Sequence, residues 1–194
     1  MDIRLININK EFNGVTVLHG LNLTIKEGAI NCIMGPSGSG KTTLANILMG
    51  LMKPDKGEIQ EPKDLKISAV FQEDRLIEHW DAVKNVLLVC GKAITETEVK
   101  EHFHRVGLGD IPNKPVRSFS GGMRRRVAIV RAIMAESNLV ILDEPFKGLD
   151  EALKLKVISY LREQTAGKTA IVITHDAEDA KLLSADIHVL EKQN

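Results

Sequence analysis

Apolar and polar positions along this chain follow two different periods. Short apolar runs at 29–34 and 139–142 have polar or glycine neighbours, which is typical of strands buried on both faces of a parallel sheet. Elsewhere apolar residues recur three and four positions apart, as at Leu44, Ile47, Leu48 and Leu51, which predicts an amphipathic helix with these side chains on its buried face. The chain therefore predicts an α/β fold.

The periods change twice along the chain. Strand patterns dominate at first, with a hairpin predicted around Asn13-Gly14. Helical spacing prevails from about 74 to 136, and strands then alternate with helices, which predicts one domain over 1–194 with a helical insert in an α/β core. The predicted strands are 2–9, 15–25, 29–34, 58–60, 66–71, 139–142, 169–174 and 187–190. The predicted helices after the first are 82–90, 96–106, 122–135, 151–164 and 176–183.

Composition narrows the classes of partner. Of 194 residues 43% are apolar, and 26 Lys and Arg balance 26 Asp and Glu, so no general cationic field favours nucleic acid or an anionic membrane. Cys32 and Cys90 are predicted to be small buried apolar residues. The first residues lack a signal-peptide pattern, and no apolar run approaches the roughly 20 residues that span a bilayer. We expect a cytosolic protein that reaches a membrane only through a partner.

A glycine-rich stretch, Gly35-Pro36-Ser37-Gly38-Ser39-Gly40-Lys41-Thr42, fits the G-x-x-x-x-G-K-[ST] pattern of a phosphate-binding loop. Glycines let successive backbone N–H groups turn towards an anion. Lys41 supplies charge for the outer phosphates, the Thr42 hydroxyl can bind Mg²⁺, and Thr43 is predicted to bind the nucleotide with the rest of the loop. An ordinary glycine-rich turn is the alternative, but the strand before the loop and the helix after it favour nucleotide binding.

Two further segments carry candidate chemistry. The apolar run 139–142 ends in Asp143, which can hold Mg²⁺ through water, and Glu144, which can orient or deprotonate an attacking water. Ser120-Gly121-Gly122 opens a predicted helix and could bind a second anion. The plainer alternatives are the start of a turn for the first segment and a helix cap for the second.

With Gln72 after a strand, Gly148-Leu149-Asp150 and His175, these motifs stand in the order found in ATP-binding cassette (ABC) ATPases. The chain resembles that family over essentially its whole length. The resemblance implies a P-loop NTPase (RecA-like) fold, in which helices flank a mixed sheet that is joined by an antiparallel β subdomain and an inserted helical subdomain.

The resemblance also implies roles for single residues. Phe12 would stack on adenine, with core packing as the alternative. Gln72 would contact Mg²⁺ and the attacking water, and His175 would sense the γ-phosphate. In a head-to-tail homodimer that forms with ATP, Ser120, Gly121 and Gly122 would contact the ATP held by the opposite subunit. Asp150 would lie at the dimer interface, although it is also the predicted N-cap of the next helix.

Two positions depart from the family. Met123 stands where the family usually has glutamine, and methionine cannot complete a capping box with Ser120. We therefore expect a looser helix start. Lys147 replaces a small residue before Gly148. The chain ends soon after His175, which predicts no added regulatory domain.

The segment 71–77, with Trp80 and Asn85-Val86, resembles bacterial importers of the nitrate, sulfonate and taurine type. It predicts Arg75, Ile77 and Trp80 as contacts to a membrane permease, with core packing of Trp80 as an alternative. The predicted function is ATP hydrolysis that powers uptake of a small anionic solute. A permease and a solute-binding protein are implied, and the chain would be peripheral on the inner face of the cell membrane.

Other functions are less well supported by the residues. A soluble, non-transporting ABC ATPase, regulatory or DNA-associated, is the main alternative, but no sustained heptads lie between Lys41 and Ser120. A P-loop kinase would need a second-substrate lid. His102 and His104 point to different helix faces, which disfavours a metal site. The basic run 124–126 is unsupported by other basic patches, so we expect no nucleic-acid partner.

Overall fold

The computed structural model describes residues 1–111 and 113–192, which form two sheets and the helices that pack against them. An antiparallel sheet has the order β2-β1-β4, and a parallel sheet has the order β5-β6-β7-β3-β8. The predicted parallel and antiparallel strands are thus divided between two sheets. The strands are β1 (Ile3–Phe12), β2 (Val15–Ile25), β3 (Ile30–Met34), β4 (Lys56–Gln60), β5 (Ile67–Val70), β6 (Leu139–Asp143), β7 (Thr169–Ile173) and β8 (Asp186–Val189).

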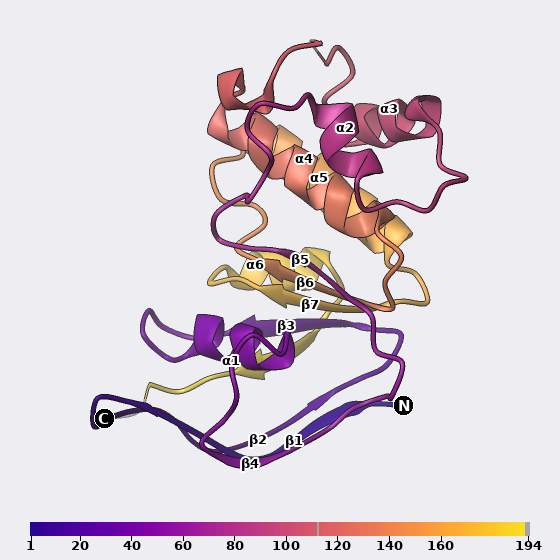
Figure 1. The fold of residues 1–194 in the computed structure, drawn as a ribbon. Coiled ribbons are helices and arrows are strands. Elements are labelled where there is room, and N and C mark those ends of the chain that lie inside the picture. Colours follow the sequence, from indigo (N-terminus) through magenta and orange to yellow (C-terminus); the bar gives the residue numbers. More distant parts are fainter. Residues whose placement is uncertain (112, 193–194) are drawn as a thin grey trace.

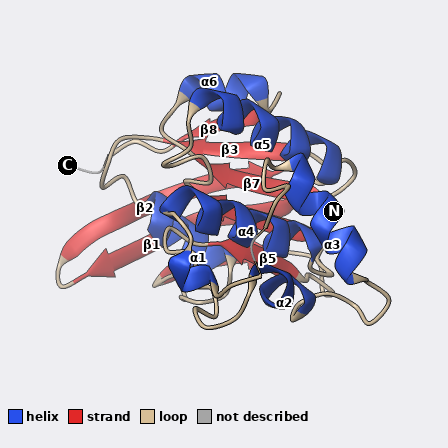
Figure 2. Ribbon diagram, turned by 90° about the horizontal axis from the view of Figure 1, so that it is seen from above, coloured by secondary structure: helices blue, strands red, loops and turns tan. Residues whose placement is uncertain are grey.

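The helices lie on both sides of the parallel sheet. Figure 1 shows α4 and α5 above it and α1 between the two sheets, and Figure 2 shows α4 and α5 overlying the strands. None of the helices in the described ranges is long and apolar enough to cross a membrane. The helices are α1 (Lys41–Leu48), α2 (Ala82–Leu87), α3 (Glu96–Arg105), the short 3₁₀ helix η1 (Val116–Ser118), α4 (Gly121–Met134), α5 (Glu151–Gln164) and α6 (Ala177–Leu182).

The parallel sheet separates two apolar cores. Along β6, Val140 and Leu142 pack with the helices, whereas Leu139 and Ile141 face α1 and the antiparallel sheet. Both faces of the strand are buried, which explains its continuous apolar run. Cys32 is buried, as predicted, in the core on the side of the sheet that α4 and α5 cover. Cys90 is only half-buried, and both residues are free thiols.

One predicted turn is confirmed by the structure, and one predicted helix end is wrong. Asn13 and Gly14 have φ of 51° and 82° and join β1 to β2, so the predicted hairpin is confirmed. The prediction that Leu51 lies on the buried face of the first helix is wrong. The helix ends at Leu48, Gly50 takes a left-handed φ of 69°, and Leu51 is 60% exposed.

Candidate active site

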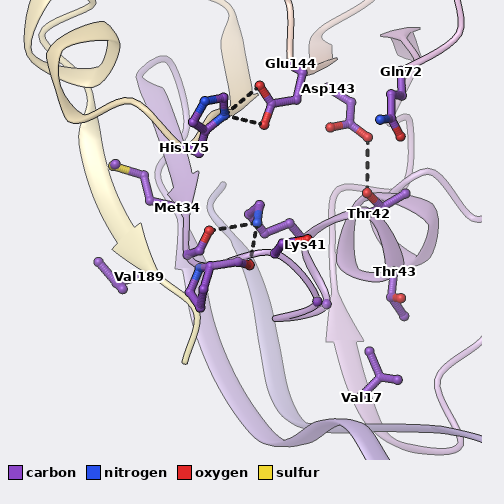
Figure 3. Close-up of a pocket in the computed structure, with 15 residues that line it drawn as sticks. Val17, Met34, Lys41, Thr42, Thr43, Gln72, Asp143, Glu144, His175 and Val189 are labelled. Atoms are coloured by element: carbon purple, nitrogen blue, oxygen red, sulfur yellow. Dashed lines mark hydrogen bonds and ion pairs between the residues drawn. The ribbon is translucent and has the colours of Figure 1, made fainter. Parts of the chain in front are cut away.

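Strand register brings the predicted site residues to one edge of the parallel sheet. Asp143 and Ile33 both pair with Ile173, so the segments that follow β3, β6 and β7 leave the sheet at one level. A cleft of about 920 Å³ opens there (Figure 3). Its lining residues are Val17, Met34, Gly35, Pro36, Ser37, Gly38, Gly40, Lys41, Thr42, Thr43, Gln72, Asp143, Glu144, His175 and Val189.

The glycine-rich loop curls around the ammonium group of Lys41. The Lys41 Nζ donates to the carbonyl oxygens of Gly35 and Pro36, each at 2.8 Å. Glycine is required at position 35, because a Cβ there would lie 2.4 Å from the Leu190 carbonyl oxygen. Ser39 does not line the cleft; it is buried, and its Oγ has no hydrogen-bond partner within the described chain.

Thr42 and Asp143 form an oxygen-rich corner of the cleft. The Thr42 hydroxyl donates to Asp143 Oδ2 at 3.4 Å (Figure 3). Burial, with a smaller contribution from Glu144, raises the pKa of the Asp143 carboxyl. A divalent cation would stabilise the ionised form of this carboxylate. Hydroxyl, carboxylate and amide oxygens suit Mg²⁺, and Gln72 lines the same cleft, so the residues present fit this ion.

Glu144 and His175 form a hydrogen-bonded pair at the opening of the cleft. His175 Nδ1 lies 3.0 and 3.1 Å from the two carboxylate oxygens of Glu144, and this hydrogen bond raises the pKa of His175. The Glu144 backbone has a φ of 49°, which for a residue with a Cβ costs about 1–3 kcal/mol and is typical of functional sites. The strained turn aims the carboxylate at the cleft.

The second predicted anion site lies in a separate cleft of about 560 Å³. The Ser120 Oγ accepts a hydrogen bond from the Met123 N–H at 3.2 Å, and Gly121 and Gly122 line the cleft with Asp150. A Cβ on Gly122 would lie 3.1 Å from the Gly148 carbonyl oxygen, so a side chain there would require the Gly148 backbone to move by a few tenths of an ångström. The structure therefore brings 120–122 and 148–150 together, and neither segment lines the cleft of the phosphate loop.

Comparison with known proteins agrees with this geometry. The ABC transporter family model matches residues 18–147. The chain belongs to the ABC transporter family. The ABC cassette is 35% identical to the spermidine/putrescine import ATP-binding protein PotA of Mycoplasma capricolum, over 98% of this chain and 59% of that protein. It is 34% identical to the probable sulfate/thiosulfate import ATP-binding protein CysA of Chlorella vulgaris, over 98% and 88% of the two chains.

Solved cassettes share the fold. A dimeric structure of the bacterial ABC transporter cassette MJ0796 has a TM-score of 0.85 and 31% identity, and covers 97% of this chain and 94% of that one. A second structure of MJ0796, in a post-hydrolysis state with ADP and Pi, has a TM-score of 0.82. These matches confirm the predicted P-loop NTPase fold. The chain spans about 59% of the length of the PotA proteins it matches first.

Some predicted residues of the cassette lie outside the main cleft. Phe12 is 41% exposed at the end of β1, so core packing does not explain it, and Val17 lines the cleft where Phe12 does not. The stacking of Phe12 on adenine stays a prediction.

Asp150 accepts a hydrogen bond from the Leu153 N–H at 2.9 Å, which confirms its structural role as the N-cap of α5.

The segment that leads into the helical insert presents the predicted permease contacts. Arg75 is exposed, with its guanidinium 3.6 Å from the centre of the Phe71 ring, and Ile77 and Trp80 are half-buried. Trp80 is therefore not a fully buried core residue of the cassette.

Neither His102 nor His104 belongs to a metal-binding cluster in the described part of the chain, and His102 Nδ1 lies 2.8 Å from the Tyr160 hydroxyl.

An ion cluster behind His175 was missed by sequence reasoning. The Lys154 ammonium lies 2.6 Å from Asp179 Oδ1 and 2.9 Å from Asp176 Oδ2, and Thr174 donates to Asp179 Oδ2 at 2.8 Å. The cluster ties α5 to the loop that carries His175. No sequence signal distinguishes it, because charged residues on two separate helices normally indicate solvated faces.

Replacing Lys154 with methionine is expected to destabilise the cassette by about 3–5 kcal/mol, because it leaves the buried Asp179 carboxylate unpaired. Chemical denaturation measures this loss. Lys156→Met on the exposed face of the same helix is the matched control and should change stability by at most about 0.5 kcal/mol. Equal stability of the two variants would contradict the prediction.

The start of α4 offers a smaller test. In α3 the Thr95 and Glu98 side chains complete a capping box, whereas at α4 only the Ser120 half of the box is present. Met123→Gln is expected to supply the missing bond and to raise the free energy of unfolding by up to about 1 kcal/mol, with a gain in ATP turnover. Denaturation and turnover assays that find neither gain would show that the missing half does not matter.

Proposed function

We propose that this chain is the ATP-binding and ATP-hydrolysing subunit of an ABC importer. The observation that carries the proposal is the single cleft that holds the phosphate loop, the Thr42–Asp143 pair and the Glu144–His175 pair. The import subunits among its relatives support the transport role rather than a regulatory or DNA-associated one.

Different residues of the cleft have different roles in the proposed reaction. Lys41 and the loop amides bind the phosphates, while Thr42, Asp143 and Gln72 would hold Mg²⁺, which offsets negative charge on the phosphates when bound. Glu144 accepts the proton of the attacking water. His175 orients the Glu144 carboxylate through its hydrogen bond and lines the cleft, where it would sense the outer phosphate.

A second subunit would complete the site. Ser120, Gly121 and Gly122 line a different cleft from the phosphate loop, so one copy cannot readily direct both at one nucleotide. We propose a head-to-tail homodimer in which these residues and Asp150 contact the partner's ATP. A dimeric structure of a relative with 31% identity supports this arrangement.

The membrane-facing partners follow from the same proposal. A permease would contact Arg75, Ile77 and Trp80 at the cytoplasmic face, and a solute-binding protein would deliver the cargo. The names of the relatives include both polyamine and sulfate importers, so the small anionic solute expected from the sequence stays a prediction.

Two measurements test the proposal. The purified protein should release phosphate from ATP only when Mg²⁺ is present, and a tagged chain expressed in its own cells should co-purify with an integral membrane protein in mild detergent. Absence of ATP hydrolysis under both soluble and membrane-bound conditions would overturn the enzymatic role. Hydrolysis without any membrane partner would instead favour a soluble ABC ATPase.

A further inference from the structure

In the arginine run that follows Met123, Arg125 and Arg126 are buried, and Arg125 binds the segment that carries Gln72. Arg125 Nη1 donates to the Phe71 carbonyl oxygen at 2.6 Å, and Nη2 donates to the Gln72 carbonyl oxygen at 2.5 Å. Its Nε lies 3.3 Å from Asp74 Oδ1, and only 7% of the side chain is exposed. All three guanidinium nitrogens therefore contact the short segment 71–74.

Arg131, which also lies on α4, binds the same segment. Arg131 donates to the carbonyl oxygens of Asp74 and Arg75, at 3.0 and 2.8 Å. Withdrawing guanidinium groups from water is costly unless their N–H groups find acceptors, and backbone carbonyls of the segment 71–75 supply these for the buried Arg125 and the half-buried Arg131. The helix that begins at the glycines of the second cleft is thus joined to the segment that enters the first cleft.

Gln72 itself depends on this support. It is exposed at the edge of the main cleft (Figure 3), and within the described chain no hydrogen bond holds its side-chain amide. Its position is consequently set by its backbone, and Arg125 is the side chain that binds that backbone. The Arg125 charge also lowers the pKa of Asp143, against the effect of burial.

We propose that Arg125 is a positioning residue for the hydrolysis reaction, which fixes Gln72 at the cleft and couples it to the helix that starts at Ser120. This inference rests on the proposed function. Its distinctive requirement is the planar fork of a guanidinium, because three separate nitrogens reach the Phe71 carbonyl, the Gln72 carbonyl and the Asp74 carboxylate, whereas lysine brings a single nitrogen.

The chain contains a matched control. Arg124 is the neighbour on the same helix with the same charge, but it is 40% exposed and its guanidinium reaches Asp74 only at 3.8 Å. Arg124→Gln therefore removes one positive charge without removing the grip on Phe71 and Gln72. Arg125→Lys keeps the charge and removes the fork, whereas Arg125→Gln removes both.

The test combines steady-state ATP hydrolysis with amide hydrogen exchange of peptides that cover 71–75. Both Arg125 variants should lower kcat by about 10- to 100-fold, as expected for a displaced group, with the KM for ATP changed less than about 3-fold. Exchange of the 71–75 amides should accelerate in both variants and stay at the wild-type rate in Arg124→Gln. Thermal unfolding identifies any variant that fails to fold, in which case Arg125→Lys decides the outcome.

Wild-type exchange at 71–75 in the folded Arg125 variants, or a kcat equal to that of Arg124→Gln, would overturn the inference. A wild-type protein without ATPase activity would instead overturn the proposed function. The exchange measurement still decides in that case whether Arg125 holds the segment.

Discussion

Glu144→Gln is expected to slow ATP hydrolysis by about 10²- to 10⁴-fold, the usual contribution of a positioned general base. The Glu144 carboxylate lines the main cleft and is held by His175 at 3.0 Å, whereas a glutamine amide cannot accept a proton from water. ATP affinity should remain, because in the proposed site Lys41 and the loop amides, rather than Glu144, bind the phosphates. Single-turnover hydrolysis and equilibrium binding measure the two effects separately.

The exposed Glu61 provides a control of the same chemistry outside the cleft. Glu61→Gln should hydrolyse ATP at the wild-type rate. If Glu144→Gln did so too, the proton acceptor would have to be another group. If it lost ATP binding instead, Glu144 would contribute to the fold of the loop rather than to the reaction.

Lys41→Met is expected to weaken ATP binding by about 10- to 100-fold, since a hydrogen bond to a charged group contributes about 1.5–3 kcal/mol. The Lys41 ammonium lies inside the curl of the loop, where its two carbonyl contacts at 2.8 Å aim it into the cleft (Figure 3). Titration with ATP by calorimetry measures the loss.

The exposed Lys53 is the control for charge alone. Lys53→Met removes the same formal charge outside the cleft and should bind ATP as the wild type does. Equal affinities in the two lysine variants would show that the ammonium of Lys41 serves only to shape the loop.

The sequence predicted those parts of the fold and site that depend on local pattern. Strand β6 was visible because both of its faces are buried, and Asp143 and Glu144 were placed at its end by the same pattern. The phosphate loop was visible because Gly35 and Gly40 are required by close approaches of neighbouring chain segments, and Gly38 is favoured by its positive φ of 79°. The end of α1 was misjudged, because the apolar period continues to Leu51 although Gly50 terminates the helix.

Long-range contacts account for what the sequence could not show. Val17 reaches the cleft from the antiparallel sheet, and Lys154 reaches Asp179 from another helix, so neither has a signature at fixed spacing. The basic run was similarly ambiguous, since Arg125 and Arg126 look like a surface patch until backbone carbonyls are found beside them. Their burial removes the structural basis for a basic surface there.

The order of the parallel sheet also constrains how the protein can be made. Strand β3, which leads directly into the phosphate loop, is hydrogen-bonded on one side to β7 and on the other to β8. Both neighbours are synthesised more than a hundred residues later, and such distant pairings form slowly. A nascent chain that has left the ribosome only as far as α5 therefore carries the whole loop without either neighbour of β3, and we expect nucleotide binding to await the synthesis of β7 and β8.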